Sequence, residues 1–271
     1  MRRWLPRLAL LLVALLLGLA ALAPWIAPFD PAETDLAQRL MPPSAEHWLG
    51  TDHLGRDLLS RLLWGARASL GAVGVILLLV LAIGTVLGCL AGLLGGVVDA
   101  VLMRLADAFM TVPTLVLALF FIGALGTGMA NVIVAIALSH WAFYARLVRG
   151  LALSLRARDH VAAARVAGAS RLDIARRHVV PAVAGQVAVL ASLDLGHWIL
   201  HVAGLSFLGL GVAAPAAEWG VMISDARPFF RTAPMLVLLP GAAILLTVMA
   251  FNLLGDALRD RLDPSLVEHG H

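Results

Sequence analysis

The sequence predicts an all-α polytopic membrane protein with six transmembrane helices, and three observations support this fold class. Hydrophobic residues make up 61% of the 271 residues and charged residues only 14%, with a mean hydropathy of +0.92. Such a composition is too apolar for an ordinary soluble domain. The charged residues are also separated by uncharged runs long enough to cross a bilayer. Finally, the arginines concentrate in alternate polar segments, as expected when cytoplasmic loops carry the positive charge.

Residues 1–29 are predicted to form the first transmembrane helix. Three arginines near the N-terminus precede an uncharged run over residues 8–29. A cleavable signal peptide is the alternative, with Ala21-Leu22-Ala23 as its cleavage motif. Pro24 would then follow the cut directly, and the apolar run exceeds the usual length of a signal peptide core. We therefore expect an uncleaved helix with its N-terminus in the cytoplasm.

Residues 30–69 are predicted to form a periplasmic loop that ends in an amphipathic helix. Leucines from Leu58 to Leu63 recur at helical spacing, and Arg56, Arg61 and Arg67 lie largely opposite them. A helix with this pattern is typical of the membrane interface, where Trp48 would add an anchor.

The other five spans follow from the remaining uncharged runs. Pro113 is expected to kink the third span, and Gly126-Thr127-Gly128 to separate it from the fourth. Asp99, Arg104 and Asp107 are expected in a cytoplasmic turn that precedes the third span. The expected ranges are 70–98 for the second span, 108–145 for the third and fourth together, the segment after Pro181 for the fifth, and 233–255 for the sixth.

The distribution of arginine sets the predicted topology. All 20 basic residues other than His are Arg, and six spans with both termini cytoplasmic place fourteen of them inside. An odd number of spans would put the C-terminal arginines outside. The fourteen are Arg2, Arg3, Arg7, Arg104, Arg146, Arg149, Arg156, Arg158, Arg165, Arg171, Arg176, Arg177, Arg259 and Arg261.

The residue types that are missing exclude several functions. The chain contains no Lys, so a phosphate-binding loop of the G-x-x-x-x-G-K-[ST] type cannot be present. Any ATP hydrolysis must therefore come from another polypeptide. Cys89 is the single cysteine, which excludes an intrachain disulfide.

A cationic, Ala-rich segment at 160–181 lies between two very apolar stretches. Gly168 permits a sharp turn, and Ser170 with Asp173 three residues later has the pattern of a helix N-cap. The segment predicts a helix–turn–helix outside the membrane, able to dock a partner. A solvated basic loop is the alternative.

The fifth span carries ionisable residues at membrane depth. Asp194, His197 and His201 are spaced i, i+3, i+7 and share one helical face, and His140 lies in the fourth span. Placing an ionisable side chain in a bilayer costs free energy, so such residues indicate a substrate path or a metal site. The alternative is that they satisfy one another within the bundle. A zinc protease site is disfavoured, because Trp198 stands where H-E-x-x-H requires Glu.

Several strings resemble the permease subunits of ATP-binding-cassette (ABC) importers. The segment at 160–181 is similar to their cytoplasmic coupling loop, although Ala162 replaces the usual Glu. The string HWLGTDHLGRD from His47 and the string SFLGLG followed by Glu218-Trp219-Gly220 resemble the dipeptide, oligopeptide and nickel branch. The histidine-containing string at 194–204, ALSHWA at 137–142 and AFNLLGDALRDRLDP at 250–264 are most similar to C-type nickel permeases.

This resemblance implies a type I importer fold in residues 70–257, with a coupling loop at 146–181 and a cytoplasmic tail at 258–271. It implies that coupling to the ATPase uses a group of small and charged residues in the loop. The implied binding-protein contacts are His47, Asp52, Arg56 and Asp57, and the coupling residues are Ala162, Ala163, Ala164, Gly168, Ala169, Ser170, Asp173, Arg177 and Pro181.

The implied function is nickel import across the bacterial inner membrane by alternating access. The partners would be a homologous second permease, two ATP-binding subunits and a periplasmic binding protein. ATP and Mg²⁺ would bind the ATP-binding subunits, and this chain would bind no cofactor and catalyse no bond chemistry. A dipeptide or oligopeptide permease is the alternative within the family. An ion-coupled secondary carrier is the alternative from another class, and a membrane metalloenzyme is the least favoured.

Overall fold

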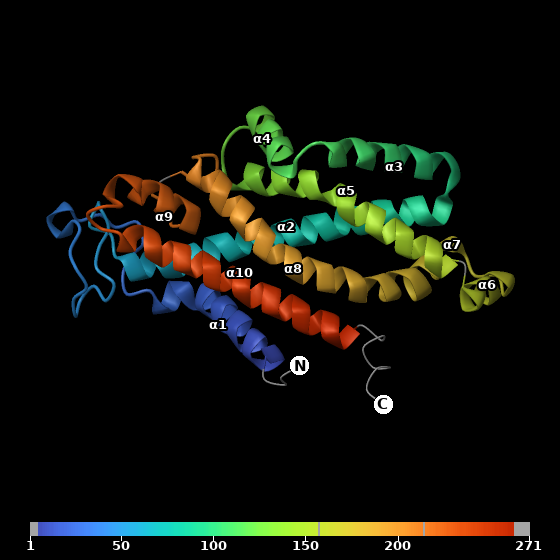
Figure 1. The fold of residues 1–271 in the computed structure, drawn as a ribbon, viewed down its shortest axis with the longest axis horizontal. Helices are drawn as coiled ribbons and strands as arrows, with labels where there is room; N and C mark the ends of the chain where they lie inside the picture. The colour runs from blue at the N-terminus through green and yellow to red at the C-terminus, as the bar shows by residue number, and fades with distance from the viewer. Residues whose placement is uncertain (1–4, 157, 214, 263–271) are drawn as a thin grey trace. The chain divides into compact units, whose positions relative to one another are not determined.

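The protein is almost entirely helical in the computed structural model, which describes residues 5–156, 158–213 and 215–262. The predicted all-α class is thus confirmed, and no β-strand is present in these three ranges. The helices are drawn in Figure 1: α1 Leu5–Ile26, α2 Leu58–Leu94, α3 Gly96–Thr111, α4 Thr114–Leu125, α5 Met129–Arg156, α6 Asp159–Val166, α7 Arg171–Ile174, α8 Val180–Phe207, α9 Trp219–Ala226 and α10 Met235–Leu262.

Five of the described helices are long and apolar enough to cross a membrane, namely α1, α2, α5, α8 and α10. The third predicted span corresponds to a bent pair, in which α3 and α4 meet at 98°, and this pair gives a sixth crossing if it is counted as one span. A kink within one helix was predicted at Pro113, but the helix ends at Thr111 and a new helix begins at Thr114. Val112 adopts an extended conformation (φ −95°, ψ 132°), as the residue before a proline commonly does. Asp99 and Arg104, expected in a turn, lie within α3.

The amphipathic helix and the second span expected from the sequence form one helix. α2 runs for 37 residues without interruption, and no proline lies inside it to remove a backbone hydrogen bond. Glycines at Gly65, Gly71 and Gly74 lower helix propensity but do not end the helix.

The chain divides into two compact units. The first comprises the described parts of Met1–Val75, Ile122–Ile133 and Ser192–Ala257, and the second those of Ile76–Phe121, Val134–Ala191 and Leu258–His271.

In the first unit, glycines bring α8 close to its neighbours. A Cβ at Gly196 would lie 3.3 Å from Val248 of α10, and one at Gly255 of α10 would lie 2.5 Å from Leu193 of α8. Gly220 of α9 packs as tightly, since a Cβ there would lie 2.3 Å from the carbonyl oxygen of Ala203.

In the second unit, three glycines spaced four residues apart form the contact of α2 with α5. Gly84, Gly88 and Gly92 are all buried. A Cβ would lie 2.5 Å from Tyr144 Cβ at Gly84, 2.5 Å from the Ala145 carbonyl oxygen at Gly88, and 2.7 Å from Ala152 Cβ at Gly92. This small-residue motif allows membrane helices to pack backbone against backbone. The charge-free run predicted the span, whereas the four-residue spacing of its glycines was not recognised as a helix contact.

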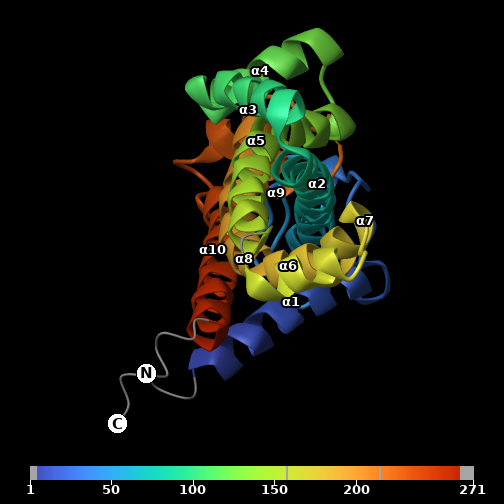
Figure 2. The ribbon, with the colours of Figure 1, turned by 90° about the vertical axis from the view of Figure 1, so that its right-hand side faces the viewer.

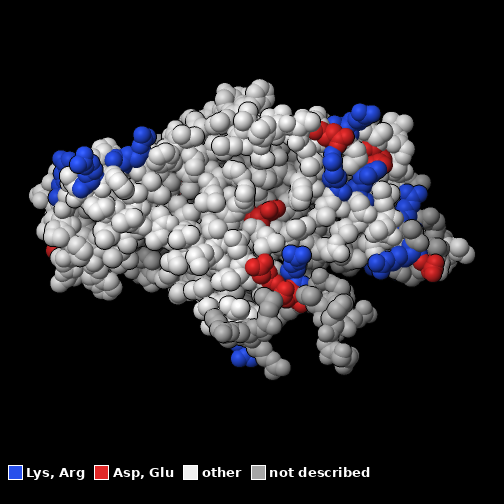
Figure 3. Space-filling view, viewed as in Figure 1, with Lys and Arg blue, Asp and Glu red and all other residues white. Residues whose placement is uncertain are grey.

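The same unit holds α3 against α5 by aromatic and ionic contacts. Phe109 packs edge-on against Trp141, with ring centroids 5.3 Å apart. Asp107 pairs with Arg146, and Asp99 accepts a hydrogen bond from Arg149 Nη2 at 2.6 Å. Figure 3 shows the corresponding mixed group of acidic and basic side chains over α3 and the C-terminal half of α5.

We predict that Gly88→Ala destabilises the protein by about 1–3 kcal/mol, because the new methyl group forces α2 away from α5. The matched control is Gly71→Ala on the same helix, where nothing lies within 4 Å of the added Cβ. Thermal unfolding in detergent should show a lower Tm for Gly88→Ala alone. Equal Tm values for the two variants would contradict a close α2–α5 contact.

Candidate functional site

The loop before α2 is held together by a buried ionic cluster. The Asp52 carboxylate accepts hydrogen bonds from Arg56 Nε at 2.6 Å and from the backbone N–H groups of Leu54 at 2.8 Å and Arg56 at 3.1 Å. Its Oδ2 also lies 3.4 Å from Arg61 Nε, so one carboxylate oxygen serves two arginines. Gly55 makes the turn between Asp52 and Arg56 with a φ of +77°, a conformation that favours glycine.

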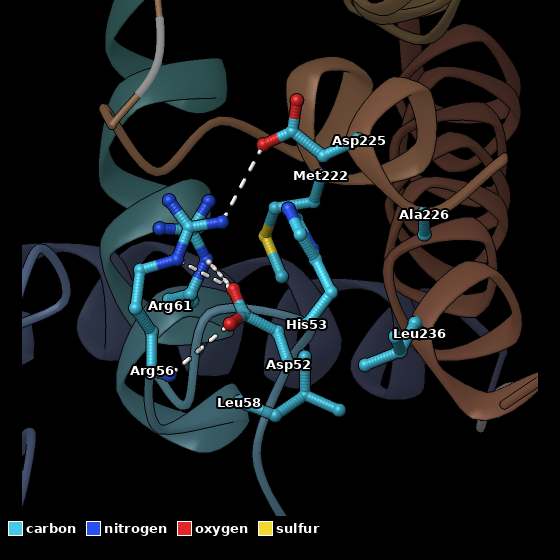
Figure 4. Close-up of a pocket in the computed structure, with 9 residues that line it drawn as sticks. All are labelled: Asp52, His53, Arg56, Leu58, Arg61, Met222, Asp225, Ala226 and Leu236. Carbon is cyan, nitrogen blue, oxygen red and sulfur yellow. Dashed lines mark hydrogen bonds and ion pairs between the residues drawn. The ribbon is translucent and has the colours of Figure 1, made fainter. Parts of the chain in front are cut away.

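The two arginines connect this loop to other parts of the first unit. Arg61 Nη1 donates to the carbonyl oxygens of Pro31 at 3.0 Å and Pro215 at 3.1 Å. Arg56 Nη2 lies 3.5 Å from Asp225 Oδ2 on α9 (Figure 4). Both arginines are only 1% exposed.

His47 and Asp57 form a second buried pair in the same loop. His47 Nδ1 lies 2.9 Å from Asp57 Oδ1, and His47 Nε2 lies 2.5 Å from Gln38 Oε1. The other oxygen of Asp57 accepts from the backbone N–H of Ser60 at 2.7 Å and so caps the first turn of α2.

These contacts change the interpretation of four residues predicted to dock a binding protein. Their exposed fractions are 5% for His47, 5% for Asp52, 1% for Arg56 and 3% for Asp57. These side chains therefore do not form part of the protein surface. The polar sequence indicated exposure, whereas the side chains pair with each other and with main-chain groups. They support the loop, and docking stays a prediction for the loop surface.

Glu218 anchors α9 to α2 from inside the protein. Its carboxylate accepts from Ser69 Oγ at 2.9 Å and caps α9 by accepting from the Val221 N–H at 3.0 Å, and the residue is fully buried. Trp219 Nε1 donates to the Leu62 carbonyl oxygen at 3.1 Å. The Glu218-Trp219-Gly220 string is visible in the sequence, but this anchoring role was not predicted. A lone Glu among apolar and small residues could have indicated a buried carboxylate with a structural partner.

The segment at 160–181 contains the helix–turn–helix that the sequence predicts. α6 and α7 are joined at Gly168, whose φ is +89°. Ser170 Oγ accepts from the Asp173 N–H at 3.1 Å, and Asp173 Oδ2 accepts from the Ser170 N–H at 3.2 Å, which is a reciprocal capping box. The hydrogen bond from the Ser170 hydroxyl is the largest cause that lowers the pKa of Asp173. The carboxylate is therefore ionised at neutral pH.

The two short helices α6 and α7 lie next to each other (Figure 2). In this segment Val161 and Ile174 are buried, whereas Ala163, Val166, Ala167 and Gly168 are exposed, and Val166 has an exposed fraction of 90%. A π-helical turn, Ala175–Val179, joins α7 to α8, and Pro181 follows in the first turn of α8. Arg176 and Arg177 are exposed. The side chain of Ala162 is not among those that the structure describes, and Arg2, Arg3 and most of the predicted tail also lie outside the described residues.

The face of α8 predicted to contact cargo brings two imidazoles together. The ring centroids of His197 and His201 lie 5.1 Å apart, with His197 exposed and His201 partly exposed. Asp194 precedes them by one turn and is also partly exposed. Within the described ranges, no three His, Cys, Asp or Glu side chains are arranged to hold a metal ion. Within these ranges the pair therefore brings two imidazole rings together without a complete set of metal ligands.

His140 is placed on α5, in the second unit. Its Nδ1 lies 2.8 Å from the carbonyl oxygen of Ile136, one turn earlier on the same helix. This contact places a proton on Nδ1, because a carbonyl oxygen can only accept.

Comparison with known proteins assigns the family. Residues 84–268 match the family model of the binding-protein-dependent transport system inner membrane component, and residues 1–43 match the N-terminal transmembrane domain of oligopeptide transport permease C. The chain is 57% identical to the nickel transport system permease protein NikC of Escherichia coli (strain K12), over 99% of this chain and 98% of NikC.

Other relatives have different names. The chain is 45% identical to the probable D,D-dipeptide transport system permease protein DdpC of Escherichia coli (strain K12), over 93% of this chain and 85% of DdpC. It is 44% identical to the glutathione transport system permease protein GsiD of Pectobacterium atrosepticum, over 94% of this chain and 85% of GsiD. The chain therefore belongs to the binding-protein-dependent inner membrane components, the permease family of ABC importers, and is a multi-pass protein of the bacterial inner membrane.

Proposed function

We propose that this chain is the permease subunit through which an ABC importer moves nickel across the inner membrane by alternating access. The observation that carries the proposal is the 57% identity to a nickel permease over almost the whole chain, against 45% and 44% to the dipeptide and glutathione permeases. A dipeptide or oligopeptide permease remains the second candidate, since such permeases are also relatives.

The histidine pair on α8 supports metal over peptide as the cargo. Imidazole nitrogen suits Ni²⁺ and other borderline divalent ions, and two rings one turn apart can share one ion. A transport path requires binding that is favourable but readily reversed. Among the described residues no third ligand completes the pair, and an open pair meets that requirement better than a closed site would. Asp194 on α8 and His140 on α5 are proposed as further groups along the path.

The chain requires partners for energy and for cargo capture. It has no Lys and hence no phosphate-binding loop lysine, so ATP and Mg²⁺ are proposed to bind two separate ATP-binding subunits. A second permease would complete the channel, and a periplasmic binding protein would deliver the cargo. The chain itself is proposed to bind no cofactor and to catalyse no reaction.

The helix pair α6–α7 is the proposed coupling element. It presents Ala163, Val166 and Gly168 on an exposed face that a protein partner can approach closely. Its opposite side is fixed by buried Val161 and Ile174, so a push on the exposed face would move the pair as one body. The arginine distribution supports a cytoplasmic location for this element and for both termini, which we propose.

We predict that His197→Ala/His201→Ala lowers ATP-dependent uptake of radiolabelled nickel into proteoliposomes of the complete complex by about tenfold or more. The reason is the loss of both imidazole ligands from α8. The control is Leu200→Ala, which truncates an exposed side chain on the same helix without removing a ligand.

Complex assembly and ATPase activity should persist in the double variant, which separates a lost metal path from misfolding. Labelled dipeptide is added as a competing cargo. Uptake of the dipeptide without nickel would overturn the metal assignment and leave the ABC permease family intact.

We predict that Ser170→Ala reduces nickel transported per ATP hydrolysed by about fivefold, because the capping box that orders α7 is lost. Asp173→Asn should act in the same direction at pH 7. Since the pKa of Asp173 is lowered in the fold, the ionised box is present above its ordinary pKa and is lost as the pH falls through the lowered value.

The matched control is Ser154→Ala, which removes a hydroxyl that bonds only within α5. Transport and ATP hydrolysis are measured in the same proteoliposomes. A ratio unchanged from wild type in Ser170→Ala would rule out α7 as part of the coupling element.

A further inference from the structure

A small pocket lies where the loop, α2 and α9 meet in the first unit. Its polar lining consists of Asp52, His53, Arg56, Arg61 and Asp225, and Figure 4 shows both guanidinium groups together between the carboxylates of Asp52 and Asp225. The other walls are apolar, from Leu58, Met222, Ala226 and Leu236. The space is sufficient for about one water-sized body.

The two arginines have more donors than the protein satisfies. Arg56 Nη1 and Arg61 Nη2 are buried and have no hydrogen-bond acceptor among the described residues. A buried donor without an acceptor is costly, and more so when it belongs to a charged group. Both residues are 1% exposed, so bulk water does not solvate them.

The two nearby carboxylates, Asp52 and Asp225, differ in how closely they approach Arg56 and Arg61. Asp52 is fully engaged, because its Oδ2 lies 2.6 Å from Arg56 Nε and 3.4 Å from Arg61 Nε. Asp225 reaches only Arg56, at 3.5 Å, and its side chain is 26% exposed and therefore partly solvated. Burial is the largest cause that lowers the pKa of His53, which keeps this neighbouring ring neutral at pH 7. Two adjacent cations thus share one well-placed carboxylate.

We propose that this pocket binds a small monovalent anion of the halide class between Arg56 and Arg61. The anion accepts hydrogen bonds from the two unsatisfied guanidinium nitrogens and ties the loop at Asp52 to α9. Charge-assisted bonds from two guanidinium groups are strong. The size of the pocket excludes sulfate, phosphate and organic acids, and its apolar walls favour weakly hydrated ions such as bromide over strongly hydrated ones.

The test is the thermal stability of the complete importer complex in nanodiscs, with bromide replacing gluconate at constant ionic strength. We expect a saturable rise in Tm of about 2–4 °C with bromide, and none with sulfate. Arg61→Gln should lose the rise. Arg67→Gln should keep it, because Arg67 lies on the same helix but is exposed and does not line the pocket. No rise in wild type, or an equal rise in Arg61→Gln, would overturn the proposal.

Diffraction from wild-type complex crystals grown in bromide provides a test that does not depend on a variant folding. An anomalous peak between the two guanidinium groups is expected. A water molecule, or a carboxylate from a partner subunit, at that position without an anomalous peak would overturn the proposal. Neither measurement involves nickel, so its outcome is separate from that of the cargo assignment.

Discussion

Close contact between helix backbones at glycine is the interaction on which both units depend. In a bilayer, helices gain little by leaving lipid, so packing and polar contacts must hold them together. Gly84, Gly88 and Gly92 supply that packing in the second unit, and Gly196 and Gly255 supply it in the first. At Gly88 the nearest atom is the carbonyl oxygen of Ala145, and at Gly255 it is the side chain of Leu193, so a larger residue at either position would collide with the neighbouring helix.

Much of the fold could be predicted from charge alone. A charged side chain is so costly in lipid that uncharged runs mark the spans directly. What charge cannot reveal is how one helix continues or breaks. Pro113 was expected only to kink the third span, whereas α3 and α4 meet there at 98°. The union of the amphipathic segment with the second span in α2 likewise has no compositional signal, since nothing in that stretch forces an end.

The candidate sites divide according to how local their contacts are. The Ser170–Asp173 box and the His197–His201 pair span three and four residues, and spacing along a helix was enough to predict them. Arg56 pairs with Asp52 only four residues away, but it also reaches Asp225 on α9, which is 169 positions away and has no local signal. Ser69 and Glu218 are separated by 149 positions. Contacts at that range depend on the completed fold, which periodicity does not describe.

The exposed tip of α6 also has a consequence for the solvation of this element. Val166 is 90% exposed at the end of a short helix that carries three alanines, so an apolar surface lies outside the apolar spans. Burying a valine side chain is worth about 1.5–3 kcal/mol relative to leaving it in water. A contact that covers Val166 would therefore be stabilising, whichever molecule supplies it.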